Sequence, residues 1–207
     1  MLDDKMERII KEMKFIKLYE EFILAETNGG EKVALFPGRF MPIHNGHIDA
    51  FQRTSKEFGG IKVIPIQIAK AGADSPFPRP LLEKIGKAVA AEYRTLLADW
   101  ILFPDNLKTV IPQMAKVVME SGFDPIALGC GADRFNDYKR QVDYLTSEKS
   151  DVKVNEFTLK SVMSRDEDGP SGTKVRETIK DGDEKEFQKL VPKSVWPFYE
   201  ELKSYIK

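Results

Sequence analysis

The sequence predicts an α/β fold: a Rossmann-like, doubly wound parallel sheet of about five strands with helices on both faces. From Lys32 onward, short apolar stretches alternate with longer amphipathic ones, which is typical of strands followed by helices. The apolar stretches are hydrophobic along most of their length, as expected of strands covered on both faces. Right-handed crossovers between such strands would make the sheet doubly wound.

The strands are short, apolar and rich in β-branched residues. The first is KVALF, and the second, IKVIPIQI, reads as a strand despite Pro65. In order, the predicted strands are Lys32–Phe36, Ile61–Ile68, Trp100–Phe103, Pro125–Gly129 and Val152–Phe157.

Glycine and proline residues mark the boundaries of the helices between the strands. Gly59 and Gly60 end the first one, and Pro80 occupies the first turn of the second, where proline is tolerated. Pro112 is expected to break the third near its middle. In order, the predicted helices are Asn45–Phe58, Pro80–Arg94, Leu107–Ser121, Phe135–Thr146, Thr173–Lys180, Glu184–Leu190 and Ser194–Ile206.

Residues 1–30 are predicted to form a helical appendage, ahead of a domain that spans residues 31–207. Apolar residues recur there in steps of three and four, and Gly29 and Gly30 follow the last of them. The appendage either packs on the main domain or forms the contact of a homo-oligomer.

Composition excludes several classes of protein. The chain of 207 residues has a single cysteine, Cys130, which rules out an internal disulfide and a cysteine zinc cluster. The net charge of −1 predicts no bulk attraction to nucleic acid or to an anionic membrane. No apolar run approaches the ~20 residues of a membrane span, and the N-terminus is charged from Asp3, unlike a signal peptide. We therefore expect a cytoplasmic protein.

The segment from Gly38 to His47, GRFMPIHNGH, follows the first strand and opens the first helix. In a doubly wound sheet ligands bind at such a place, and a helix N-terminus favours phosphate. Gly38 suits a tight turn, and Gly46 lets the backbone approach a ligand. Both histidines of the chain, His44 and His47, lie here and share one helical face. Two histidines alone supply too few ligands for a zinc site, so the segment predicts a phosphate site.

This segment resembles the GxFxPxHxGH signature of the nucleotidylyltransferase superfamily, the cytidylyltransferase-like or HIGH-type enzymes. The second signature of that family, S-x-T-x-x-R, is matched by SGTKVR at Ser171–Arg176. A third segment, GCGADR at Gly129–Arg134, is similar to the family's G-x-D segment, which meets the base and ribose. The resemblance covers roughly residues 32–195.

Different segments of the chain resemble different members of the superfamily. The first signature and the tail from Ser171 to Val195 resemble archaeal-type nicotinamide mononucleotide adenylyltransferases. The middle segment GADRFNDYKRQVDYL and the run SRDEDG at Ser164–Gly169 resemble nucleotidyltransferase-like proteins of large tailed phages. A phage origin would place the protein in the host cytoplasm.

The resemblance implies roles for individual residues. His44, His47 and Arg176 would be catalytic, meeting the triphosphate oxygens. The implied nucleotide-binding residues are Gly38, Arg39, Phe40, Gly46, Gly129, Gly131, Asp133, Arg134, Ser171 and Thr173. Lys70 and Arg79 would bind the acceptor, with a solvated surface charge as the alternative for both. Asp166 and Asp168 read as an acidic surface loop or as metal ligands.

The implied reaction is nucleotidyl transfer from a nucleoside triphosphate to a phosphorylated small molecule, with release of pyrophosphate. Adenylyl transfer from ATP to nicotinamide mononucleotide is the leading hypothesis. Cytidylyl transfer to a phosphorylated alcohol or sugar is one alternative, and a non-catalytic nucleotide-binding or structural protein is another. Mg²⁺ is expected to arrive with the triphosphate, because no dedicated protein cage for a metal is visible. Neither nucleic acid nor membrane is an expected partner.

Overall fold

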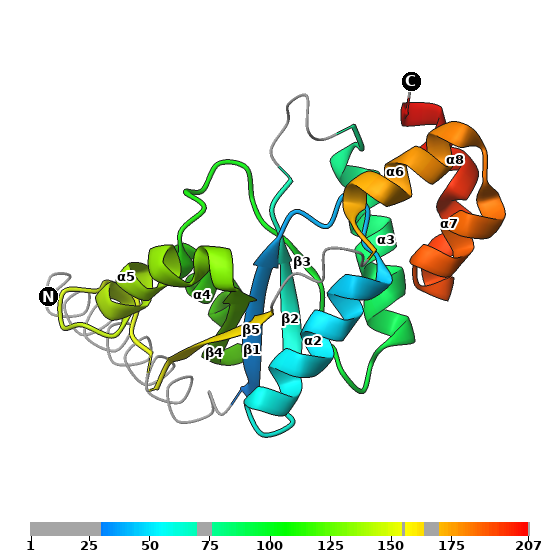
Figure 1. Ribbon diagram of the computed structural model, residues 1–207. Coiled ribbons are helices and arrows are strands. Elements are labelled where there is room, and N and C mark those ends of the chain that lie inside the picture. The colour runs from blue at the N-terminus through cyan, green and yellow to red at the C-terminus, as the bar shows by residue number, and fades with distance from the viewer. Residues whose placement is uncertain (1–29, 70–75, 155, 164–169, 207) are drawn as a thin grey trace, which may run out of the picture.

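The computed structural model describes residues 30–69, 76–154, 156–163 and 170–206 (Figure 1). Nearly all of the predicted N-terminal appendage lies outside these residues, as do Lys70, Asp166 and Asp168. The described chain forms one five-stranded parallel sheet in the order β3-β2-β1-β4-β5. The predicted Rossmann-like α/β class is thereby confirmed.

Four of the five predicted strands are confirmed in place, and the fifth was predicted too early. The strands are β1 (Glu31–Gly38), β2 (Lys62–Gln67), β3 (Ile101–Leu102), β4 (Phe123–Gly131) and β5 (Thr158–Met163). Val152, Val154 and Phe157 are apolar because they pack as a loop on the core under α4 and α5. Among the described residues the true strand pairs only with β4, at the sheet edge, and its sequence TLKSVM is correspondingly more polar.

The helices follow the prediction closely in number and order. They are α2 (Asn45–Glu57), α3 (Arg79–Glu92), α4 (Ile111–Glu120), α5 (Phe135–Leu145), α6 (Gly172–Asp181), α7 (Glu184–Leu190) and α8 (Tyr199–Tyr205), with 3-10 turns η1 (Ala132–Arg134) and η2 (Lys193–Phe198).

Two helix boundaries differ from the prediction, each beside a proline. Helix α4 begins at Ile111 instead of Leu107, with Pro112 in its first turn, where the missing N–H breaks no helical bond. The Gln141 side chain accepts a hydrogen bond from the Ile111 N–H at 2.9 Å. The last predicted helix starts as η2, which contains Pro197, and becomes α-helical only from Tyr199.

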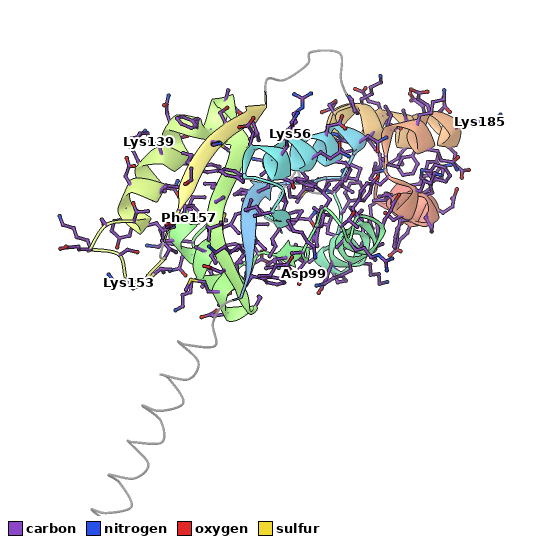
Figure 2. The ribbon with its side chains drawn as sticks, turned by 90° about the horizontal axis from the view of Figure 1, so that it is seen from below. Lys56, Asp99, Lys139, Lys153, Phe157 and Lys185 are labelled. Carbon is purple, nitrogen blue, oxygen red and sulfur yellow. The ribbon has the colours of Figure 1, made fainter. Side chains whose placement is uncertain are left out.

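The sheet separates two layers of helices (Figure 1). Helices α2 and α3 cover one face, and α6–α8 lie beyond them on the same side, around a core that includes Phe51, Trp100 and Phe187. Helices α4 and α5 cover the other face around Ile64 and Val118. Figure 2 shows α5 on the opposite side of the sheet from α2 and α7. Within the described ranges, each helix is too short or too polar to cross a bilayer.

Gly129 of β4 allows α2 to lie close to the sheet. A Cβ atom added there would meet Thr54 Oγ1 at 2.6 Å and Thr54 Cγ2 at 2.7 Å. Since both groups are buried, the helix or the Thr54 side chain would have to move. We therefore expect Gly129→Ala to lower the free energy of unfolding by about 1–3 kcal/mol. Urea denaturation measures this change.

A second substitution tests the cause of that loss. Thr54→Ala removes the two nearest atoms that the new methyl group would meet and leaves only Phe36 Cδ2, at 3.2 Å. The loss of stability in the double variant should therefore be smaller than the sum of the two single losses. Additive losses in the double variant would show that the contact between Gly129 and Thr54 is not the reason.

The strand order places a switch point between β1 and β4. The chain runs from β1 outward to β2 and β3, then returns to β4 on the other side of β1. In sheets of this kind, ligands bind outside the carboxyl ends of the strands at such a point. Gly38 ends β1 and Gly131 ends β4, so two of the predicted segments begin at this edge.

Candidate active site

The starts of α2 and α6 meet beside the carboxyl end of β1. His44 is the N-cap residue of α2, and Ser171 is that of α6, where its Oγ accepts a hydrogen bond from the Lys174 N–H at 3.2 Å. Arg176, one turn into α6, donates from Nη1 to the Met41 carbonyl at 2.6 Å. Two motifs far apart in the chain therefore form one surface, at which two helices direct the positive ends of their dipoles.

Two glycines ease this approach of the motifs. A Cβ atom on Gly46 would lie 3.1 Å from His44 Nδ1 and 3.2 Å from the Pro170 carbonyl oxygen. One on Gly172 would lie 3.1 Å from the Met41 carbonyl oxygen. Gly46 was predicted to serve close approach of a ligand; here it also serves close approach of the second motif.

The two histidines are fixed by mutual backbone and side-chain contacts. The His44 N–H donates to His47 Nδ1 at 3.2 Å, and the His47 N–H donates to the His44 carbonyl at 2.9 Å. The two rings stack with centroids 3.7 Å apart and planes at 29°. Because His47 Nδ1 accepts a hydrogen bond, its proton resides on Nε2, which is thus a donor.

Both imidazoles are neutral at pH 7. Burial lowers the pKa of His44 to about 4. Burial, together with the charge that His44 would carry when protonated, lowers the pKa of His47 well below its ordinary value of 6.5. His44 Nδ1 is buried and has no hydrogen-bond partner among the described residues. A neutral histidine pair with a spare polar atom is suited to an incoming anion, which would stabilise protonation.

These lowered pKa values predict a dependence of stability on pH. Below pH 6.5 the unfolded chain gains protons at both histidines, while the folded chain leaves His44 neutral down to about pH 4. The unfolded state then binds more protons, so the free energy of unfolding falls as pH falls through this interval. In urea titrations from pH 7.5 to 4.5, we expect a shallower decline in the His44→Gln, His47→Gln double variant. Equal slopes in the two proteins would contradict it.

Gln67 and Trp100 support the first motif from below, and sequence reasoning missed both. Gln67 Nε2 donates to the carbonyls of Arg39 and Phe40, each at 3.2 Å, and Gln67 Oε1 accepts from Trp100 Nε1 at 2.9 Å. The only signal in the sequence was a polar residue within the apolar stretch IKVIPIQI. A buried amide requires partners, but the pattern does not say which ones.

The residues of the third predicted segment take different positions. Gly129 packs against α2, as described above, within the strand. Gly131 ends β4, and a Cβ atom there would lie 2.6 Å from Asp133 Oδ1. Asp133 and Arg134 are exposed in η1, with Asp133 Oδ2 3.8 Å from Arg134 Nε. Arg39 is also exposed, at the same edge of the sheet.

Arg79, predicted to bind the acceptor, connects three segments of the fold. Its guanidinium donates to the Ala69 carbonyl at 3.4 Å and to the Phe103 carbonyl at 3.0 Å, and it pairs with Asp105. These contacts join the ends of β2 and β3 to the start of α3. These contacts give Arg79 a structural role, whether or not it also binds an acceptor.

A pocket of about 260 Å³ lies alongside the second motif. Thr173 and Arg176 line it together with Lys180 and Tyr205, which sequence reasoning did not single out. The full lining is Pro76, Thr173, Arg176, Glu177, Lys180, Tyr205 and Ile206. The pocket thus continues along α6 beyond the motif itself, with Glu177 beside the cations Arg176 and Lys180.

Solved structures of nucleotide adenylyltransferases share this fold. Plasmodium falciparum nicotinic acid mononucleotide adenylyltransferase complexed with NaAD matches 84% of this chain and 97% of its own, with a TM-score of 0.55 and 12% identity. The same enzyme complexed with APC matches 84% and 98%, with a TM-score of 0.55 and 13% identity. A putative nicotinate-nucleotide adenylyltransferase from Vibrio parahaemolyticus matches 82% and 98%, with a TM-score of 0.53 and 14% identity.

Comparisons at the level of sequence gave no match, either to a protein-family model or to a curated protein. At 12–14% identity, the structural likeness extends to the fold and not to the individual residues of the site. The described domain has the Rossmann-like α/β fold of nicotinate mononucleotide adenylyltransferases.

Proposed function

We propose that this protein is a nucleotidyltransferase, which transfers a nucleoside monophosphate from a triphosphate to a phosphorylated small molecule. One observation carries the proposal: Arg176 Nη1 donates to the Met41 carbonyl at 2.6 Å, across 135 positions of the chain. That bond unites a histidine pair, two helix N-termini and a guanidinium on one surface. Each of these groups favours phosphate, and together they match the requirements of a triphosphate.

In the proposed reaction, the protein positions its reactants and stabilises negative charge. A phosphate oxygen of the acceptor attacks the α-phosphorus, the bond from that phosphorus to the bridging oxygen of the β-phosphate breaks, and pyrophosphate leaves. Nε2–H of His47 would donate to the phosphoryl group being transferred, and His44 would take up a proton from solvent as the anion binds. Arg176, Ser171 and Thr173 would hold the outgoing pyrophosphate. Electrostatic stabilisation of this kind requires no covalent intermediate.

Magnesium would be held mainly by the phosphates of the substrate. Within the described ranges, no three or more His, Cys, Asp or Glu side chains converge as metal ligands do. Mg²⁺ commonly binds through one or two carboxylates plus substrate phosphates, so we expect the metal to enter with the nucleotide. When bound, the ion neutralises charge on the triphosphate.

We infer that the acceptor is a pyridine mononucleotide and that the donor is ATP. Support comes from the first and last motifs, which resemble nicotinamide mononucleotide adenylyltransferases, and from neighbours named as nicotinate mononucleotide enzymes. The test is a screen for pyrophosphate release in the presence of Mg²⁺. It crosses ATP, CTP, GTP and UTP with both pyridine mononucleotides and with phosphorylated alcohols and sugars.

The outcomes of this screen separate the alternatives. Release with ATP and either pyridine mononucleotide supports the proposal and shows which of the two pyridine mononucleotides is the acceptor. Release with CTP alone reassigns the protein as a cytidylyltransferase. No release from a folded protein that binds a triphosphate, across all pairs, overturns the pyridine-nucleotide assignment and favours a non-catalytic nucleotide-binding protein.

A further inference from the structure

We propose that Gln67 and Trp100 are positioning residues: they hold Phe40 against the His47 ring and thereby orient the Nε2–H of His47. The inference rests on the proposed function for its effect on turnover, but its structural part does not. It concerns a connected set of side chains that we call the Gln67 clamp, made of Gln67, Trp100 and Phe40.

Gln67 fixes the backbone of the first motif. Its side chain lies at the end of β2 and is only 1% exposed. Nε2 reaches two consecutive carbonyls, those of Arg39 and Phe40, at 3.2 Å each. Both amide hydrogens are thus directed at one turn of the loop, so neither carbonyl can rotate without leaving a buried donor unpaired.

Trp100 fixes the amide of Gln67. Its indole Nε1–H donates to Gln67 Oε1 at 2.9 Å, which leaves the NH₂ group of the amide facing the loop. The indole itself has little freedom, because a Cβ atom on Gly86 would lie 2.2 Å from its ring. Trp100 is 2% exposed. Its indole contacts Gly86 of α3 on one side and Gln67 on the other, so it links α3 to the first motif.

Phe40 transmits this constraint to His47. Its φ of +48° is in the left-handed region, which a residue with a side chain occupies only when its surroundings hold it there. Its ring packs over Gly38 and lies 5.2 Å from Trp100 and 4.9 Å from His47, centroid to centroid. The Phe40 and His47 rings meet edge to face, at 89°.

The His47 ring is therefore confined from two sides. His44 stacks on one side at 3.7 Å, and the Phe40 ring contacts it on another at 4.9 Å. While the ring is held, His47 Nδ1 keeps its hydrogen bond from the His44 N–H, and the Nε2–H tautomer is selected. If Phe40 relaxes, the ring can turn, that bond lengthens, and the selection is lost.

The test uses the fact that the chain has only two histidines. The tag-free protein, labelled with ¹⁵N-histidine, has four imidazole nitrogens, which long-range ¹H–¹⁵N NMR spectra resolve by protonation state. In the wild type we expect His47 Nδ1 to be unprotonated and Nε2 to be protonated. In Gln67→Leu we expect the two shifts to move toward each other, as the tautomers mix. Unchanged His47 shifts in a folded Gln67→Leu protein would overturn the proposal.

Turnover gives the second readout. Misplacement of a reacting group by about 1 Å costs on the order of a hundredfold in rate. We expect kcat of Gln67→Leu to fall by about tenfold to a hundredfold, with a much smaller change in the KM of the triphosphate. An equal change in both parameters, or none, would count against a positioning role.

Two further variants separate positioning from loss of stability. Trp100→Phe keeps a ring against Phe40 but removes the indole donor to Gln67 Oε1, so its effects should be in the same direction and smaller. Ser150→Ala is the matched control. Ser150 is also buried and makes two hydrogen bonds with Val152, but it lies in the turn after α5. It should lower stability while leaving the histidine shifts and kcat unchanged.

The design also separates failure of this inference from failure of the proposed function. If the wild type transfers no nucleotidyl group, the NMR result still decides whether the Gln67 clamp sets the His47 tautomer. If the wild type is active and the His47 shifts are unchanged in Gln67→Leu, the proposed positioning role of the Gln67 clamp is wrong and the proposed function is unaffected.

Discussion

Replacing His47 with alanine is expected to reduce pyrophosphate release by about 10²–10³-fold, the cost typical of removing one preorganised donor to a transition state. The structure gives His47 a single outward donor, Nε2–H, because Nδ1 accepts from the His44 N–H. Alanine removes that donor, while the Asn45 amide in the same turn donates to the Lys189 carbonyl. The measurement is kcat/KM for the triphosphate and acceptor pair identified by the screen.

The same variant must be shown to fold. His47 also packs against Phe40 and His44, so some loss of melting temperature is expected. Gln52→Ala is the matched control, since Gln52 is exposed on the same helix and lies outside the site. A His47→Ala protein that melts cooperatively and keeps a rate within threefold of the control would refute the assigned role.

Arg176→Lys is expected to raise the KM of the triphosphate by about tenfold to a hundredfold, although the positive charge is retained. The guanidinium uses two of its nitrogens to join Met41 and Thr173, at 2.6 Å and 3.2 Å, and still presents a planar group to a ligand. A lysine ammonium is a point donor on a flexible stem and cannot make both contacts while it binds phosphate. Charge-assisted hydrogen bonds of about 1.5–3 kcal/mol account for a change of this size.

Lys174→Ala is the control for the role of charge. Lys174 lies in the first turn of the same helix, and its side chain is exposed. Removing it lowers the positive charge at the start of α6 without touching the contact to Met41. If Lys174→Ala raises KM as much as Arg176→Lys does, binding depends on the general field and not on the guanidinium geometry.

The sequence predicted the architecture well, because strands buried on both faces and amphipathic helices leave clear patterns. It failed at β5 for a physical reason. Val152 and Phe157 are apolar since they seal the core as a loop, whereas the edge strand that follows carries Lys160 and Ser161. Hydrophobicity correctly indicated that Val152 and Phe157 pack on the core. The strand that pairs with β4 is the next segment, Thr158–Met163.

The candidate site was predictable only where it depends on side chains in a spaced motif. The spacing of His44 and His47 indicated a shared helical face; in the structure His44 is the extended N-cap residue just before α2, and the two rings stack. The partner of Arg176 was not predictable, because a backbone carbonyl such as that of Met41 leaves no trace in the sequence. Gln67 was missed for the related reason that its two acceptors are also backbone carbonyls.

The bond between Arg176 and Met41 ties the candidate site to the folding of the C-terminal helices. It joins two residues 135 positions apart, so the candidate site is complete only when the C-terminal helices have docked on the first βα unit. A chain that has formed its sheet but not this contact retains the histidine pair and lacks the guanidinium. A triphosphate that bridged both groups would therefore bind the complete fold more tightly than partly folded forms. Through linkage, it would stabilise the docking of the C-terminal helices on the rest of the domain.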